Sequence, residues 1–101
     1  MTDSVFDILT TSLGKLDALG TPGQIRDFFV QEHIAGISSA DQCPVACYLS
    51  RELGAAPNWR IACVTRGFAS VPRAGIRVIT PPVVKLFIER FDRNAYPDLK
   101  L

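Results

Sequence analysis

Apolar residues recur every three or four positions at the start of the chain, which predicts an amphipathic helix over about residues 3–19. The apolar face of this helix is formed by Val5, Leu9, Leu13 and Leu16. Gly14 interrupts the pattern at a cost of roughly 1 kcal/mol relative to alanine, so a break or kink is expected most readily there. Gly20 is a natural end for the helix.

Two more helices are predicted where a proline follows a residue that can cap a helix. Thr21-Pro22 starts the second, because threonine is a good N-cap and proline suits the first helical position. Gly36 is expected to end this helix, after an apolar stripe formed by Ile25, Phe28, Phe29 and His33. Cys43-Pro44 starts the third helix, which we expect to extend to Leu53 and to end at Gly54.

The apolar period changes to two after Pro57, which predicts β-structure. In the first run, one face carries Trp59, Ile61, Cys63 and Thr65, and the other carries Arg60, Ala62, Val64 and Arg66. We expect the face with Cys63 to be buried. A second run over residues 76–79 is separated from the first by residues 67–75, which are rich in glycine and proline. The pattern predicts a two-stranded antiparallel β-hairpin with a long tip, which packs one face on the helices and displays arginines on the other.

A fourth helix starts at Thr80-Pro81, which repeats the Thr-Pro pattern, and extends to about Arg93. Its buried side is formed by Val84, Phe87, Ile88 and Phe91. Asn94 is expected to end it, and residues 96–99 form a tail that folds back. The whole chain, residues 1–101, is therefore predicted to be a single α+β domain with three N-terminal helices, a two-stranded hairpin and a C-terminal helix. This order is compatible with a winged helix.

The charged residues are divided unevenly along the chain. Residues 1–50 carry two basic and six acidic side chains, a net charge of −4, whereas residues 51–101 carry nine basic and four acidic side chains, a net charge of +5. The second half is thus suited to an acidic partner, unless the two halves neutralise one another in the fold. No stretch approaches the roughly 18 apolar residues of a membrane span, and the acidic N-terminus does not resemble a signal peptide. We expect a cytoplasmic protein that does not bind membrane.

Three cysteines are the chain's main candidates for chemistry. Cys43 precedes the first residue of a helix, where free N–H groups and the helix dipole stabilise a thiolate. A catalytic thiol also needs a base, and His33 is the only histidine, with nothing in the sequence that places it beside Cys43. Cys43 and Cys47 with Cys63 and His33 would make a four-ligand metal set, but the spacing is a weak signal. We therefore expect no enzyme activity, catalytic residue, metal or cofactor.

Two short motifs add a resemblance. Residues 43–49, CPVACYL, are followed near the end of the chain by residues 80–92, TPPVVKLFIERFD, and then by YPDL at residues 96–99. Together they resemble a group of small, mostly uncharacterised proteins of actinobacteria and their phages, over about residues 21–99. The resemblance implies a cytosolic protein of phage or actinobacterial origin and implies no catalytic residues.

The hairpin carries the strongest prediction of a binding surface. It contains Arg60, Arg66, Arg73 and Arg77, with Phe68 in its tip, and this mixture is typical of residues that contribute most to protein–protein binding. An exposed strand edge would also pair with a strand of a partner or of a second copy. We expect a small non-enzymatic interaction or regulatory protein that contacts a cytosolic protein partner through these five residues.

The alternative is a winged-helix-like DNA-binding regulator in which the same arginines contact phosphates. Against it, the helix that would read bases, PVACYLSREL over residues 44–53, has Arg51 as its single basic side chain. The acidic first half of the chain would also repel DNA.

Overall fold

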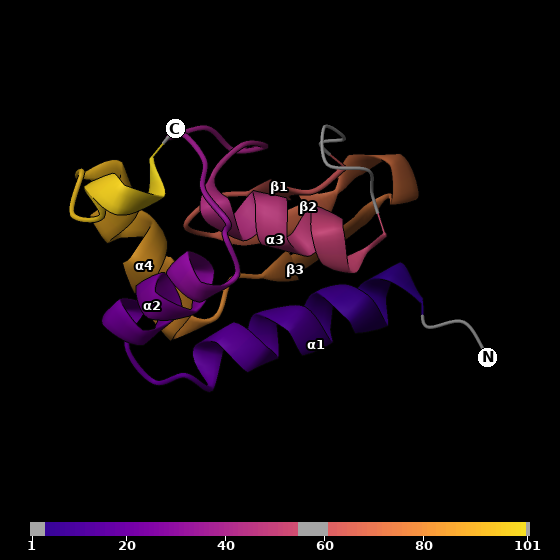
Figure 1. The fold of residues 1–101 in the computed structure, drawn as a ribbon. Helices are drawn as coiled ribbons and strands as arrows, with labels where there is room; N and C mark the ends of the chain where they lie inside the picture. The colour runs from indigo at the N-terminus through magenta and orange to yellow at the C-terminus, as the bar shows by residue number, and fades with distance from the viewer. Residues whose placement is uncertain (1–3, 55–60, 101) are drawn as a thin grey trace.

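The helices begin close to where the proline and capping residues predict them. A computed structural model describes residues 4–54 and 61–100 (Figure 1). Its α-helices are α1 (Val5–Asp17), α2 (Pro22–Gln31), α3 (Pro44–Glu52) and α4 (Pro82–Asp92). The first three are capped locally, because the Ser4 hydroxyl, the Thr21 hydroxyl and the Cys43 thiol each accept a backbone N–H from the first turn. The predictions for these three starts are confirmed to within two residues.

Helix α1 runs through Gly14 without a break. Leu13 and Leu16 on either side of it are almost completely buried, and their packing holds the helix together. A Cβ atom added at Gly14 would meet nothing within 4 Å, so the glycine is not needed for close packing.

Helix α2 ends before the predicted Gly36. His33 adopts a left-handed conformation (φ 57°), its N–H donates to the Val30 carbonyl, and the Ile34 N–H donates to the Phe29 carbonyl. This bond pattern is a Schellman motif with histidine at the position that glycine usually occupies. His33 therefore ends the helix as an exposed residue and is not part of its apolar stripe.

The β-structure has three strands in the described residues, and the prediction of a two-stranded hairpin is wrong. Strands β1 (Cys63–Val64), β2 (Phe68–Val71) and β3 (Ile76–Ile79) form an antiparallel sheet in the order β1-β2-β3. The segment predicted as a long tip supplies β2, and the short 3₁₀ helix η1 (Pro72–Ala74) turns the chain into β3. Ala69 and Val71 of β2 are buried, so pairing this segment adds apolar area that a free tip would leave in water.

The buried face of β1 is opposite to the one predicted. Ala62 and Val64 are buried, whereas Cys63 is half-exposed. The Ala62 N–H donates to the Ser50 hydroxyl (3.1 Å) and the Val64 N–H donates to the Ala40 carbonyl (2.6 Å), which fixes this segment against α3 and the loop before it. Buried and half-exposed residues alternate only over residues 61–64, and the strand is limited to β1, whereas the predicted run covered residues 59–66. Trp59 lies outside the described residues.

Helix α4 is not capped by Thr80. Its N-cap is Pro81, which has no side-chain acceptor, and the Val83 N–H instead donates to Asp17 Oδ1 at the end of α1 (2.9 Å). Thr80 is occupied elsewhere, since its hydroxyl donates to the Thr65 carbonyl (3.0 Å). Asn94 (φ 64°) ends the helix as predicted.

One core joins all these elements. Helices α1 and α3 lie against the same side of the sheet, and α2 and α4 pack together at one end (Figure 1). Aromatic rings of Phe29, Tyr48 and Phe87 meet in the centre at centroid distances of 5.3–5.8 Å. The tail folds back as predicted: the 3₁₀ helix η2 (Pro97–Leu99) contacts α2, and Leu99 is buried. Within the described residues, no helix is long and apolar enough to cross a membrane.

Candidate partner-binding face

The sheet has one buried face and one open face. Strand register places Phe68 opposite Ile79, and Ser70 opposite both Arg77 and Cys63. Residues directly opposite one another in antiparallel strands share a face, so these five side chains lie together. We call this the outer face, because the other side of the same strands carries the buried Val64, Ala69 and Val71.

The outer face presents two large apolar side chains and a stacked arginine. Phe68 is 44% exposed and Ile79 is 77% exposed. The Arg77 guanidinium lies over the Phe68 ring, 4.4 Å from its centroid, which is a cation–π contact worth roughly 0.5–1 kcal/mol at an exposed site. This contact favours the stacked arrangement of both side chains in the free protein, and partly ordered groups lose less conformational entropy on binding.

The other predicted arginines are distributed at the two ends of β2. Arg66 lies in the connection between β1 and β2, two residues before Phe68 in the chain, and Arg73 lies in η1 at the far end of β2. Both are exposed. The predicted cluster around one flexible tip is therefore divided, because the segment between these two arginines is a strand. Arg60 lies outside the described residues.

The connection that carries Arg66 is fixed by two threonines. The Phe68 N–H donates to Thr65 Oγ1 (3.2 Å), and the Thr65 N–H donates to the Phe68 carbonyl (2.8 Å). Thr80 adds its hydroxyl bond to Thr65 and donates its N–H to the Gly67 carbonyl (3.1 Å). Sequence reasoning assigned Thr80 to a helix cap and so missed its role in this turn.

Ile79 is the residue of the outer face that sequence reasoning missed as a contact. The alternation along residues 76–79 already placed it beside Arg77 and away from the packed side. An isoleucine on the polar side of an alternating strand was the available signal.

The outer face is basic because no acidic side chain lies near it in sequence. Between Glu52 and Glu89 the chain contains no aspartate or glutamate. Among the residues that the structure describes, neither Arg66, Arg73 nor Arg77 forms an ion pair, whereas Arg26 pairs with two aspartates and Arg51 with two glutamates. Ion pairs between the two halves of the chain thus involve Arg26 and Arg51. Arg66, Arg73 and Arg77 have no ion-pair partner among the described residues.

Cys43 is a packed capping residue. Its side chain is 4% exposed, and its sulfur accepts the Ala46 N–H (3.4 Å). Burial raises the pKa of the Cys43 thiol to about 11, and the backbone hydrogen bonds from Ala46 and Val45 only partly oppose this. The helix start therefore does not produce the low-pKa thiolate that its position favours.

Cys47 lies one helical turn from Cys43 in α3, but the other two predicted ligands lie on other elements. His33 is exposed beyond the end of α2, and Cys63 lies on the outer face. Within residues 4–54 and 61–100, no group of three or more histidine, cysteine, aspartate or glutamate side chains is placed to hold a metal ion.

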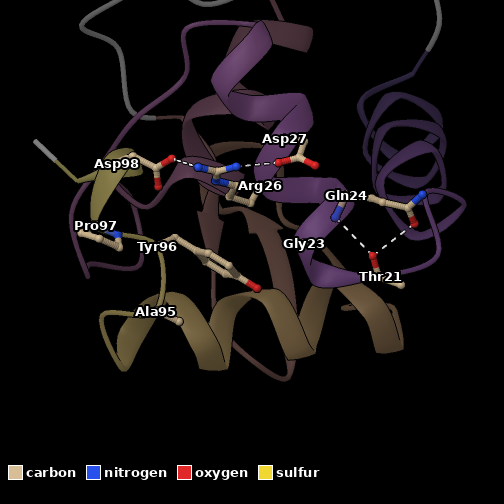
Figure 2. A pocket seen from close by; sticks show the side chains of 9 residues that line it. All are labelled: Thr21, Gly23, Gln24, Arg26, Asp27, Ala95, Tyr96, Pro97 and Asp98. Carbon is tan, nitrogen blue, oxygen red and sulfur yellow. Dashed lines mark hydrogen bonds and ion pairs between the residues drawn. The ribbon is translucent and has the colours of Figure 1, made fainter.

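An open pocket of about 720 Å³ lies between α2 and η2 (Figure 2). Arg26 crosses it and pairs with Asp27 and Asp98, while Thr21 caps α2 at its other end. The Tyr96 ring stacks on Phe87 of α4 (5.2 Å between centroids). The charged groups of this pocket already satisfy one another, so it offers a ligand less unpaired charge than the outer face does.

No protein-family model, curated protein or solved structure matches the chain. The resemblance to small actinobacterial and actinophage proteins therefore stays a prediction from two short motifs.

Proposed function

We propose that the chain is a small non-enzymatic interaction or regulatory protein that binds another protein through the outer face and its flanking arginines. The observation that carries this proposal is an exposed Phe68–Arg77 stack beside Ile79, in a region whose arginines have no acidic partner. Residues of these types dominate binding energy when an interface buries them. We place this activity in the cytoplasm of an actinobacterium or of a cell infected by its phage.

The partner is expected to present an apolar residue bordered by carboxylates. An apolar group would cover Phe68 and Ile79, and carboxylates would pair with Arg66 and Arg77 at the border. Arginine suits this role, because its planar guanidinium can stack on a ring and bond a carboxylate at the same time.

DNA binding is the competing hypothesis and receives less support. In a winged helix the recognition helix is exposed to the groove, but six of the nine residues of α3 are buried in the core. The aliphatic side chain of Ile79 also cannot form a hydrogen bond or an ion pair with a phosphate.

The test is capture of a partner from a lysate of the source organism by the immobilised protein and by variants. We expect a protein, identified by mass spectrometry, that the wild type captures and that Phe68→Ala, Arg66→Glu and Arg77→Glu lose. Lys85→Glu is the matched control, because it makes the same charge change on an exposed residue of α4. Indifference of capture to all three variants would rule the proposal out.

The salt dependence of binding distinguishes a DNA partner from a protein partner. A random duplex retained at about 50 mM salt and released at about 200 mM, with the same variant pattern, would favour DNA over a protein partner.

A further inference from the structure

Strand β3 is an edge strand that α1 contacts, and its outward backbone groups have no hydrogen-bond partner in the described part of the chain. It is the last strand of the sheet, and the Thr80 N–H that follows it donates to Gly67 of the segment before β2. Because bonded and non-bonded pairs alternate in an antiparallel ladder, Ile76 and Val78 direct their backbone groups to β2. The N–H and C=O groups of Arg77 and Ile79 therefore point away from the sheet.

The two edges of the sheet differ in whether their outward backbone groups are hydrogen-bonded. At the β1 edge, the outward Val64 N–H is bonded to the Ala40 carbonyl (2.6 Å), and the strand has only two residues. At the β3 edge, no residue in the described part of the chain bonds the outward groups of Arg77 or Ile79. Proteins usually cover or shorten such edges, since an uncovered one is a template for another strand.

We propose that the partner binds by adding an extended acidic segment to β3, so that its backbone pairs with Arg77 and Ile79. This inference rests on the proposed function and specifies its geometry. A strand added there would place every second side chain on the outer face, next to the Ile79 side chain and the Arg77–Phe68 stack.

Charge complementarity selects the occupant. Acidic residues on the outer face of the added segment would meet Arg77, which forms no ion pair within the described residues. A second copy of this chain fits less well, because its own β3 would bring another Arg77 and its sheet region contains no acidic residue.

The direct test is residue-resolved amide exchange by NMR with a defined probe, an N-acetylated hexapeptide of sequence Glu-Thr-Val-Thr-Glu-Thr, in which two glutamates flank a valine on one face of the strand. In the free protein, the Arg77 and Ile79 amides are expected to exchange at least about tenfold faster than that of Val78. The peptide should slow these two amides about tenfold or more and leave Val78 nearly unchanged. The same peptide with lysine in place of glutamate should leave all three unchanged.

A lack of protection at Arg77 and Ile79 with the acidic peptide at millimolar concentration would overturn the inference. Equal protection by the lysine peptide would overturn its charge requirement, and protection that appears in the free protein as its concentration rises would identify a second copy as the occupant. Protection by a single-stranded oligothymidylate instead of the peptide would assign the face to nucleic acid.

Two variants separate this inference from the proposed function. Ile79→Ala removes the side chain, whereas Ile79→Pro removes the side chain and also the outward N–H, which proline at a sheet edge can do without breaking the inner ladder. We expect Ile79→Pro to bind the captured partner, or the acidic peptide, at least about tenfold more weakly than Ile79→Ala. If the two bind equally while Phe68→Ala abolishes capture, the outer face binds its partner without strand addition, and only the further inference fails. Unchanged urea midpoints would show that both variants fold.

Discussion

At the scale of single residues, backbone contacts decide which glycines matter. Gly36 is buried where two segments cross, with its N–H bonded to the Leu99 carbonyl, and a Cβ added there would lie 2.1 Å from the Gln42 carbonyl oxygen. Gly14 lies in the middle of α1 with open space around it. In the sequence Gly14 appears as an interruption of a helical pattern and Gly36 as the end of one, and only the structure separates the required glycine from the dispensable one.

We predict that Gly36→Ala destabilises the protein by about 2–3 kcal/mol or more, because the clash is with backbone that cannot rotate away. Gly14→Ala should instead stabilise it by about 0.5–1 kcal/mol, since alanine loses less backbone entropy in a helix. Urea unfolding of both variants checks the pair. A Gly36→Ala protein as stable as the wild type would mean that these segments are not held so closely.

The Cys43 thiol gives the stability a dependence on alkaline pH. Burial raises its pKa from 9.0 to about 11, so the unfolded chain loses this proton more easily than the folded one. The stabilisation is complete below about pH 9 and disappears as the pH rises towards 11.

We predict that the wild type loses about 2 kcal/mol more than Cys43→Ala between about pH 8 and pH 10.5. Tyr48, whose pKa burial raises to about 12, is present in both proteins and cancels in the difference. Urea titrations at the two pH values measure it, and parallel losses in the two proteins would contradict the assignment to Cys43.

At the scale of elements, what the sequence predicts well is what neighbouring residues determine. Thr21-Pro22 and Cys43-Pro44 start helices because cap and first turn are adjacent, and these starts are confirmed. Thr80-Pro81 shows the same local pattern, yet the Thr80 hydroxyl bonds to the distant Thr65. Glycine and proline bracket the segment of β2 and predict a loop there, whereas its pairing on both sides depends on residues that the local pattern does not include.

The start of α4 provides a prediction at this scale. Asp17 accepts the Val83 N–H across 66 residues of sequence, so Asp17→Ala should cost about 1–2 kcal/mol, the range of lost N-caps. Asp17→Asn keeps an oxygen acceptor and should cost less than half of that. If both variants lose the same stability in urea, the acceptor oxygen is not what stabilises this junction.

At the scale of the whole molecule, four residues of the candidate contact set fall in described parts of the chain, but their arrangement was not predictable. The sequence named Arg66, Phe68, Arg73 and Arg77 because their types suit binding. It could not show that Phe68 and Arg77 stack or that Arg73 lies at the opposite end of β2, since both facts follow from strand register. It also could not show which arginines lack an ion-pair partner. The ion pair between Arg51 and Glu32, for example, forms because α2 and α3 bring the two side chains together.

The C-terminal tail packs against α2 and Gly36, and its residues contribute to stability in different ways. Leu99 is 1% exposed, and its carbonyl accepts the Gly36 N–H, so it belongs to the core. The neighbouring Asp98 pairs with Arg26 across the surface pocket (Figure 2), where both side chains keep about 40% of their exposure. An exposed ion pair is worth little, because water and salt screen it and two long side chains must be ordered.

We therefore predict that Leu99→Ala costs about 2–5 kcal/mol in urea unfolding, as a buried leucine does, whereas Asp98→Ala costs no more than about 1 kcal/mol and less at high salt. Leu13→Ala in α1 is the matched control, since Leu13 is equally buried in the same core. If Leu99→Ala lowers the free energy of unfolding as little as Asp98→Ala does, the core is stable without the tail. A loss comparable with that of Leu13→Ala would mean that the last described residues complete the core, to which the tail contributes through its contacts with α2.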